Sequence, residues 1–389
     1  MAKAQKPLME AQAVGAPMPS GRYERMVVKI GTNVLTAGTD RLDLEVMSSL
    51  VGQVARLHRQ GRDVLIVSSG AIACGRHRLG TARERKDIPF RQVLASVGQT
   101  YLMQAYDELF AWHDIVVAQT LLTKRDLADR QGYLNARNTL LALLEARAVP
   151  IVNENDVVAV EEIEGVKIGD NDNLSALVSN LVDADLLVLL TDQAGLFTTD
   201  PRLHPDARLI QRVERIDEEI EQLAGESGER GVGGMTTKIQ AARLATAGGT
   251  NVVIADGREK GILVRLADGK ALGTLFPATA DRMESRKRWM LAGLSLKGSI
   301  VVDGGAARAL RQEKRSLLPA GIRRVEGTFE RGDAIAICDG EGQRIACGIA
   351  SYGSSDIETI HGLRSERIEE VLGYQYGAEV VHRDNLVLL

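Results

Sequence analysis

Cysteine is rare in this chain of 389 residues, and the small number limits what the thiols can do. Only Cys74, Cys338 and Cys347 occur. An odd and sparse set does not form a disulfide framework and suits a reducing compartment, so we expect a cytoplasmic protein. Histidine is also rare, with six scattered residues. Cys338 and Cys347 lie near each other in the sequence, but two thiols without neighbouring histidines make a poor metal site. The sequence therefore predicts no metal centre built from side chains.

Long apolar segments are absent as well. No run of apolar residues is long enough to cross a bilayer, so we expect no contact with a membrane. Residues 1–22 mix Ala, Gly, Pro, Gln and Lys without the apolar core of a signal peptide, and we expect a disordered tail. The formal net charge of -4 gives no electrostatic reason to expect nucleic acid as the main partner.

The remaining composition is that of an ordinary globular protein, with 44% hydrophobic and 26% charged residues. The length favours two domains or three. From residue 25 to about residue 268, short aliphatic runs alternate with longer segments whose apolar residues have helical spacing. The predicted strands are 26–30, 64–67, 115–118, 149–152, 186–190 and 251–255. This alternation predicts an α/β fold with a mostly parallel sheet sandwiched by helices.

The pattern of apolar runs and turns changes after residue 296. Short runs at 299–302, 322–325, 334–338, 344–350 and 379–382 are separated by Gly-rich turns, which is typical of a small, mostly β module. We therefore predict a tail at 1–22, an α/β domain at 23–280, a linker at 281–296 and a β domain at 297–382.

Ligands of parallel α/β folds bind beyond the carboxyl ends of the strands, so polar residues at those ends are candidates for function. Lys29 lies near the end of the first predicted strand, and Gly31 opens the turn. Taken alone, Lys29 would be an ordinary solvated lysine. In the segment 66–73, small residues allow the N–H groups of Gly70 and Ala71 to face an anion at a helix N-terminus.

Amide and acidic side chains follow two later strands. Residues 153–156 read Asn-Glu-Asn-Asp, directly after a buried strand, and can hold a small polar ligand. Residues 169–173 read Gly-Asp-Asn-Asp-Asn before a helical pattern. A single Asp or Asn there would be an N-cap, but five consecutive positions exceed what a cap requires. Thr191 and Asp192 follow a further strand.

A glycine-rich loop at residues 231–238 reads Gly-Val-Gly-Gly-Met-Thr-Thr-Lys and leads into a helix. Glycines permit close backbone approach, helix N–H groups face an anion, and Lys238 supplies charge, so the loop can cradle phosphate. The loop matches neither the Walker A pattern nor the dinucleotide-binding fingerprint.

Together these motifs resemble the amino acid kinase family, and within it the kinases that phosphorylate the side-chain carboxylate of free glutamate. The resemblance covers roughly residues 25–382. It implies an amino acid kinase-like fold and ATP, with Mg²⁺, as the co-substrate. A carboxylate with a pKa near about 4.3 is ionised at pH 7, so this chemistry needs no general base.

The resemblance also implies a role for each matching residue. Lys29 and Lys238 would be catalytic, with Asp172 orienting them. Glutamate would be bound by Ser69, Asp156 and Asn171. The nucleotide would be bound by Lys29, Thr191, Asp192, Val232, Gly233, Gly234, Met235, Thr236, Thr237 and Lys238.

The same resemblance implies a place in metabolism. It predicts the first step of proline biosynthesis, with proline as a feedback inhibitor at a site overlapping that of glutamate. It also predicts a functional link to glutamyl-phosphate reductase and a homo-oligomer, either a dimer or a tetramer.

The C-terminal segment resembles a PUA domain, through the motifs at 316–321, 331–333 and 348–352. PUA domains are best known from RNA-modifying proteins. From residue 297 onward, however, 12 Lys and Arg stand against 14 Asp and Glu, a net charge of -2. A surface that binds phosphates is normally basic, so the charge balance argues against RNA as a partner.

Two alternative functions stay open at this point. One is another amino acid kinase, acting on N-acetylglutamate, aspartate or carbamate. An anionic Asp156 in the substrate site favours a free α-ammonium over an acetylated nitrogen. The other is an RNA-binding regulator on a kinase scaffold, which the presence of both lysines and of the acidic cluster 170–172 opposes.

Overall fold

A computed structural model describes residues 23–39, 41–80, 87–159, 171–226, 234–279 and 296–388. The predicted tail, most of the predicted linker and the start of the glycine-rich loop lie outside these residues. The chain forms two compact units. The first takes its described residues from Met1–Thr123, Leu141–Thr246 and Thr250–Ala278, and the second takes them from Lys124–Leu140, Ala247–Gly249 and Thr279–Leu389.

The first unit is built on a seven-stranded sheet in the order β3-β4-β2-β1-β5-β6-β7. Strands β1 to β6 run parallel, and only the short β7 at one edge is antiparallel to its neighbour. The strands are β1 (Arg25–Ile30), β2 (Asp63–Ser68), β3 (Val117–Leu122), β4 (Val149–Glu154), β5 (Leu186–Thr191), β6 (Asn251–Asp256) and β7 (Thr274–Phe276). The predicted α/β class with a mostly parallel sheet is confirmed.

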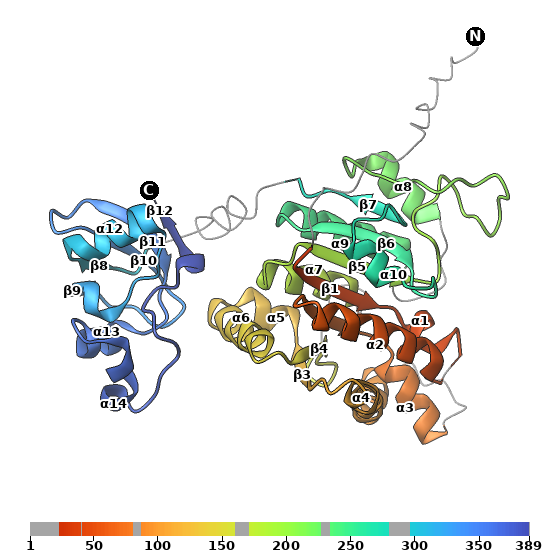
Figure 1. Ribbon diagram of the computed structural model, residues 1–389, viewed down its shortest axis with the longest axis horizontal. Coiled ribbons are helices and arrows are strands. Elements are labelled where there is room, and N and C mark those ends of the chain that lie inside the picture. Colours follow the sequence, from red (N-terminus) through yellow and green to blue (C-terminus); the bar gives the residue numbers. More distant parts are fainter. Residues whose placement is uncertain are drawn as a thin grey trace, which may run out of the picture. The chain divides into compact units, whose positions relative to one another are not determined.

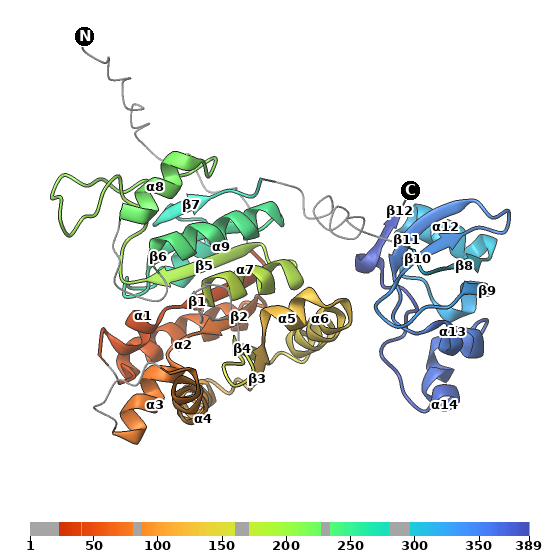
Figure 2. The same ribbon diagram turned by 180° about the vertical axis from the view of Figure 1, so that it is seen from behind.

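Helices cover both faces of this sheet. Figure 1 shows α2 and α10 in front of the strands, and the reverse view in Figure 2 shows α7 and α9 in front. Central strands such as β1 and β5 are buried at five of their six residues, because covered faces favour continuous apolar runs over alternation. The helices of the first unit are α1 (Thr32–Thr36), α2 (Leu44–Arg59), α3 (Ala71–Leu79), α4 (Ile88–Ala111), α7 (Asn171–Leu181), α8 (Glu218–Glu226), α9 (Met235–Ala247) and α10 (Ile262–Ala267). Helix α5 (Lys124–Ala128) and the first part of α6 (Arg130–Glu145) belong to the second unit.

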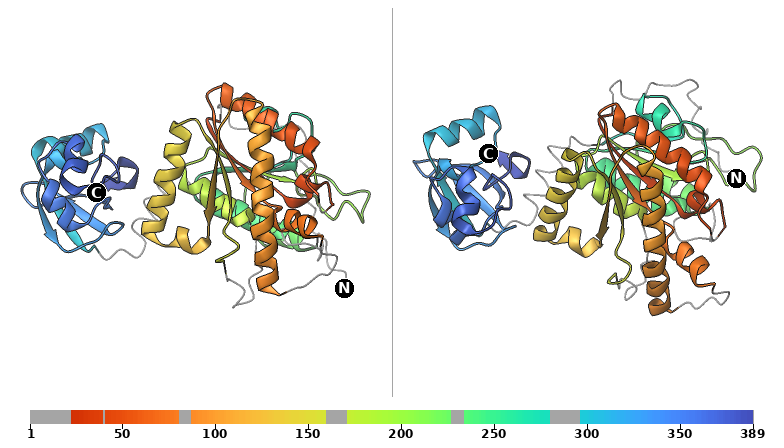
Figure 3. Two further views of the ribbon diagram at one scale, coloured as in Figure 1. Left: turned by 90° about the horizontal axis from the view of Figure 1, so that it is seen from below. Right: turned by 60° about the horizontal axis from the view of Figure 1, so that its bottom comes forward.

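Two glycines let α3 pack against α4, the 24-residue helix drawn in orange in Figure 3. A Cβ atom on Gly75 would lie 1.9 Å from the carbonyl oxygen of Leu94, and one on Gly98 would lie 1.7 Å from that of Ala71. No side chain fits at such distances. The close approach brings the middle of α4 next to the N-terminus of α3, where the second strand ends.

The second unit has a five-stranded sheet in the order β12-β11-β10-β8-β9. Its core gathers aliphatic side chains such as Ile300, Ile335 and Ile337 around the buried Tyr352. The strands are β8 (Gly298–Val302), β9 (Ile322–Gly327), β10 (Ala334–Cys338), β11 (Arg344–Ile349) and β12 (Leu386–Leu388), and the helices are α12 (Gly304–Glu313), α13 (Ser354–Ile360) and α14 (Ile368–Leu372). Short 3₁₀ turns lie at Pro319–Gly321, Ser365–Arg367 and Arg383–Asn385. The predicted small, mostly β module is confirmed.

Two local predictions were wrong, and the short edge strand of the first sheet was missed. Strand β3 begins at Val117 rather than 115, because the N–H of Ile115 still bonds the carbonyl of Phe110 at the end of α4. Residues 379–382 do not form a strand; Val381 makes a single bridge with Leu317, and the last strand is β12. The edge strand β7 was not predicted, since three residues give too short a pattern to recognise.

Candidate active site

The carboxyl ends of the parallel strands gather the polar residues that the sequence singled out. Lys29 is the fifth residue of the six-residue strand β1, and Gly31 follows at its end. A Cβ atom on Gly31 would lie 3.3 Å from the carbonyl oxygen of Leu190 and 3.7 Å from the Lys29 ammonium. Gly31 therefore passes close to the end of β5, where a side chain would be tight against the carbonyl group of Leu190.

Asp172 joins two lysines that come from different parts of the chain. Lys29 Nζ lies 2.6 Å from Oδ1 of Asp172, and Lys238 Nζ lies 3.2 Å from Oδ2. Lys29 and Lys238 are each 4% exposed, and Asp172 is 1% exposed. Asp172 is in the first turn of α7, and Lys238 is in the first turn of α9. Two buried positive charges therefore share one carboxylate at the end of the sheet.

The charges explain the ionisation of this group. Burial raises the pKa of Asp172, but the neighbouring Lys29 and Lys238 outweigh it and lower the pKa to about 2. The hydroxyl of Thr237 also donates to Oδ2 at 2.7 Å. The carboxylate is ionised at neutral pH, and it leaves the pair of lysines with one net positive charge for a further anion.

A chain of side-chain amides lies beside the lysines. Asn171 donates from Nδ2 to the carbonyl of Ser68 at 3.2 Å, to Oγ of Ser69 at 3.2 Å and to Oδ1 of Asn153 at 3.1 Å. Asn153 in turn donates to Oε1 of Gln99 at 2.8 Å. The predicted substrate residues Ser69 and Asn171 are therefore in direct contact, and both connect to the end of β4.

Asp156 lies two residues past the end of β4 and is partly buried. Burial raises the pKa of its carboxyl group, and the charge of Arg91 partly opposes the rise. A carboxylate in such a place gains from a cationic ligand, because the ligand replaces the lost hydration. Asp156 follows Asn153 by three positions, so it belongs to the same strand end.

Thr191 and Asp192, which were predicted to bind the nucleotide, lie at the end of β5. Thr191 ends β5, and its hydroxyl lies 3.2 Å from Oδ1 of Asp192. Asn33 donates to Oδ2 of Asp192 at 3.2 Å, and Arg258 donates to the carbonyl of Asp192 at 2.6 Å. Burial raises the pKa of Asp192, but these hydrogen bonds and Arg258 lower it below the usual value. The segment is thus held in place by contacts from three strand ends.

The glycine-rich loop is only partly described. Val232 and Gly233 lie outside the described residues. Gly234 is exposed with open space around its Cβ position, and α9 begins at Met235. The next turn contains Thr236 and Thr237, then Lys238, so the N–H groups of this helix start beside the lysine pair.

Sequence reasoning missed four residues of this site. Asn153 was noted only as part of a polar segment, and Asn33 was not singled out. Gln99 and Arg258 gave no local signal, since a glutamine within a helix and an arginine after a strand are common. They reach the site through tertiary contacts, which spacing along the chain does not encode.

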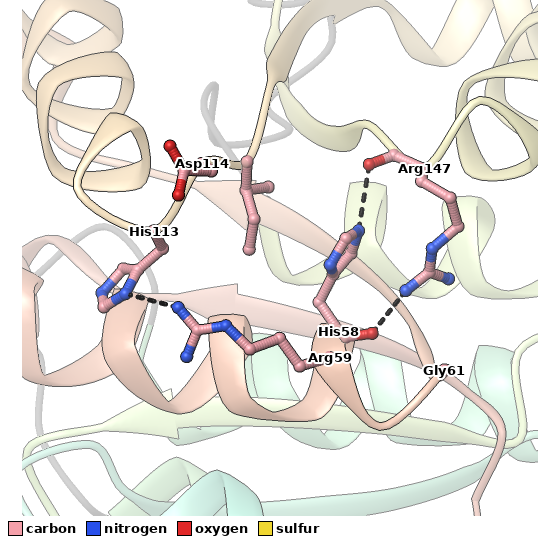
Figure 4. Close-up of a pocket in the computed structure, with 7 residues that line it drawn as sticks. His58, Arg59, Gly61, His113, Asp114 and Arg147 are labelled. Atoms are coloured by element: carbon pink, nitrogen blue, oxygen red, sulfur yellow. Dashed lines mark hydrogen bonds between the residues drawn. The ribbon is translucent and has the colours of Figure 1, made fainter.

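A pocket of about 610 Å³ lies at the opposite end of the strands. Figure 4 shows Arg147 and His58 joined by two hydrogen bonds, one from Arg147 to the carbonyl of His58 and one from His58 Nε2 to the carbonyl of Arg147 at 2.9 Å. Arg59 donates to Nδ1 of His113 at 3.1 Å. The pocket is lined by His58, Arg59, Gly61, His113, Asp114, Ile115 and Arg147. Because these residues lie at or just after the C-terminal ends of α2, α4 and α6, we attribute a structural role to them.

The described residues contain neither a candidate metal site nor a candidate membrane span. Within them, no group of three or more His, Cys, Asp and Glu side chains could hold a metal ion. No helix among them is both long and apolar enough to cross a bilayer.

Comparisons with known proteins agree with this geometry. Residues 24–256 match the amino acid kinase family, and residues 298–372 match the PUA domain. A protein of Dehalococcoides mccartyi (strain CBDB1) named glutamate 5-kinase is 54% identical over 368 residues, covering 94% of this chain and 99% of that protein. Proteins of the same name from Herpetosiphon aurantiacus and Deinococcus radiodurans are 53% and 50% identical, each over 366 residues. They cover 94% of this chain and 98% and 100% of their own lengths.

Proposed function

The chain belongs to the amino acid kinase family, and from this we propose that it transfers the γ-phosphoryl group of ATP to the γ-carboxylate of L-glutamate. The product is L-glutamyl 5-phosphate. The observation that carries the proposal is the buried group in which Lys29 and Lys238 share Asp172, at 2.6 Å and 3.2 Å. Full-length relatives that are 50–54% identical and named glutamate 5-kinase support the same substrate.

The reaction brings one anion to another, so its main requirement is positive charge and alignment. A γ-carboxylate oxygen forms a bond to the γ-phosphorus, and the bond from that phosphorus to the β,γ-bridging oxygen breaks as ADP leaves. No proton is transferred, because the carboxylate is already ionised at pH 7. Lys29 and Lys238 would stabilise the charge on the transferring group, and Asp172 would fix their positions.

Each substrate has a proposed set of contacts. Ser69, Asp156 and Asn171 would bind glutamate, with Asp156 facing the ammonium group. Thr191, Asp192 and the residues from Val232 to Lys238 would bind the nucleotide. Mg²⁺ would enter with the ATP phosphates and shield their charge, which fits a site whose buried carboxylate is already engaged by two lysines.

The test is a panel of acceptors offered with ATP and Mg²⁺ while ADP release is measured. We expect ADP release with glutamate and little with N-acetylglutamate or aspartate. N-acetylglutamate lacks an ammonium group, and aspartate is one methylene shorter. Hydroxylamine should trap the acyl phosphate as a hydroxamate. Equal turnover of N-acetylglutamate would contradict the proposal and support the alternative kinase.

Regulation by proline is a further part of the proposal. Proline carries an α-carboxylate and a secondary ammonium at the positions of those of glutamate, so it can occupy the same contacts without offering a γ-carboxylate. We expect inhibition that high glutamate relieves. Unchanged activity with millimolar proline at low glutamate would count against this regulation and leave the catalytic proposal standing.

A further inference from the structure

The side-chain amide of Asn153 has only one possible orientation. The backbone N–H of Glu154 donates to Oδ1 of Asn153 at 2.9 Å, and a backbone N–H can never accept a hydrogen bond. Nδ2 of Asn153 must then face Gln99, whose Oε1 lies 2.8 Å away. The oxygen of Gln99 is therefore committed to Asn153, and Nε2 points to the other side.

This Nε2 atom of Gln99 is buried, and within the described residues it has no hydrogen-bond partner. Burying an N–H donor without a partner is unfavourable, and native structures seldom leave one so. Gln99 comes from the middle of α4, which the contact at Gly98 holds against the N-terminus of α3. The donor is thus held rigidly at the edge of the proposed glutamate site.

The orientation of the Asn171 side-chain amide follows from the same reasoning, but here the oxygen, not the nitrogen, points away from the contact. Its Nδ2 donates to the backbone carbonyl of Ser68 and to Oδ1 of Asn153, and a carbonyl can only accept. Oδ1 of Asn171 therefore points away, and it too is buried without a partner within the described residues. The shared contact with Asn153 thus leaves one free donor on Gln99 and one free acceptor on Asn171.

These two atoms match two of the three charged groups of glutamate. The γ-carboxylate must reach Lys29 and Lys238, where phosphoryl transfer would occur. The ammonium group needs acceptors, which Asn171 and Asp156 provide. The α-carboxylate then needs a donor away from the lysines, and the buried Nε2 of Gln99 is such a donor.

We propose that Gln99 is a specificity-determining residue whose Nε2 donates to the α-carboxylate of the substrate. The inference rests on the proposed function. Gln99 would select a substrate with a free α-carboxylate, and Asn153 would act as a positioning residue that orients both amides. The site would thereby favour an α-carboxylate, whose two charged oxygens both accept, over an α-amide, which is uncharged and keeps one acceptor.

The experiment changes the hydrogen-bonding group on each side of this contact, in the side chain of residue 99 and in the α-group of the ligand. Glutamate is compared with isoglutamine, which carries an α-amide and keeps the γ-carboxylate. Both are tested with the wild type and with Gln99→Glu, by calorimetric binding and by turnover. We expect Gln99→Glu to weaken glutamate binding roughly 100-fold, because a carboxylate replaces the donor. We expect isoglutamine binding, relative to glutamate, to improve at least roughly tenfold in the variant.

A matched control is Gln104→Glu, which adds the same charge on the exposed side of α4, where Gln104 donates to Glu108. It should bind both ligands as the wild type does. If Gln99→Glu fails to fold, Gln99→Met serves instead and should raise the KM for glutamate roughly 10- to 100-fold, with kcat changed far less.

The possible outcomes separate this inference from the proposed function. If the ratio of the affinities for glutamate and isoglutamine is unchanged in a folded Gln99→Glu protein, the proposed role of Gln99 is overturned. Glutamate turnover by the wild type would still uphold the kinase. Glutamate binding without ADP release in the wild type would overturn the kinase, and the binding ratio would still judge Gln99. No glutamate binding by the wild type would overturn both.

Discussion

The ammonium group of Lys29 lies 2.6 Å from Oδ1 of Asp172, and the two side chains are 5% and 0% exposed. Desolvating both charges is costly, and their attraction alone seldom does more than offset that cost. Lys238 on the other carboxylate oxygen gives the group one net positive charge. A buried cation held by a rigid partner suits a site that stabilises a developing anion.

Replacing either lysine by methionine should reduce turnover and leave the fold intact. Methionine keeps much of the apolar stem and removes the charge, and a lost charge-assisted contact in a buried site costs on the order of 10²- to 10³-fold in kcat. We expect Lys29→Met and Lys238→Met each to show this loss. Because both serve one charge, the double variant should lose less than the product of the two.

The matched control for the lysine variants is Lys270→Met, which changes an exposed lysine after α10. It should keep wild-type kcat, and circular dichroism should find all variants folded. Near-normal kcat in both Lys29→Met and Lys238→Met would mean that the pair has a structural role only.

Much of this site follows from the sequence because its motifs are local. The segment around Lys29, the amide-rich start of α7 and the lysine after the glycine-rich loop each stand at a strand end or a helix start. The rule that parallel strands place their carboxyl ends together predicts that such segments meet. The contact between Lys29 and Asp172 is an instance.

Other features of the site depend on packing, which local patterns do not reveal. Gln99 lies in an uninterrupted helix, and its place beside Asn153 depends on the glycines that let α3 approach α4. The edge strand β7 is defined by pairing with β6 rather than by its own three residues. The late start of β3 depends on how α4 ends.

Acid should destabilise the wild type through Asp172. The pKa of this group falls from 3.8 to about 2 on folding, so the unfolded chain binds a proton more readily between these pH values. The resulting stabilisation is complete above pH 4 and is lost as the pH falls toward 2, by about 2 kcal/mol. Urea unfolding should therefore show that the difference in the free energy of unfolding between the wild type and Asp172→Asn becomes smaller as the pH falls from 4 to 2.

The surface substitution Asp107→Asn, also made on an exposed carboxylate of the same unit, controls for the removal of one acidic group. Comparing Asp172→Asn with Asp107→Asn separates the effect of the buried carboxylate on the free energy of unfolding from that of losing one acidic group. A difference between wild type and Asp172→Asn that stays constant from pH 4 to pH 2 would contradict the assignment of the lowered pKa.

Glutamate capture should weaken in mild acid because of Asp156. Burial raises the pKa of this carboxyl group above 3.8, and a protonated carboxyl cannot pair with an ammonium group. The plot of log kcat/KM for glutamate should therefore fall on its acidic side at a higher pH than an ordinary aspartate would give. In Asp156→Asn, kcat/KM should be low, and the acidic limb should move to lower pH, where only protonation of the γ-carboxylate of glutamate remains. A limb that persists unchanged in the variant would assign it to another group.

The contact between α3 and α4 should be intolerant of a single methyl group. Alanine normally stabilises a helix interior by up to about 1 kcal/mol relative to glycine. At Gly98, however, the new Cβ would lie 1.7 Å from the backbone oxygen of Ala71, and overpacking of this kind typically costs about 1–3 kcal/mol. We expect Gly98→Ala to lower the free energy of unfolding by at least about 1 kcal/mol. It should also raise the KM for glutamate, because the adjacent Gln99 must move.

The control is Gly52→Ala in the interior of α2, where the nearest atom to the new Cβ would be Nε2 of His113 at 3.9 Å. That distance is ordinary contact, so the propensity gain should appear undiminished and Gly52→Ala should be as stable as the wild type or more stable. Urea unfolding of the three proteins measures both effects, and the glutamate KM of each reports on Gln99. If Gly98→Ala matched Gly52→Ala in stability and in KM, α3 and α4 would have to be free to separate. The rigid placement of Gln99 would then lose its basis.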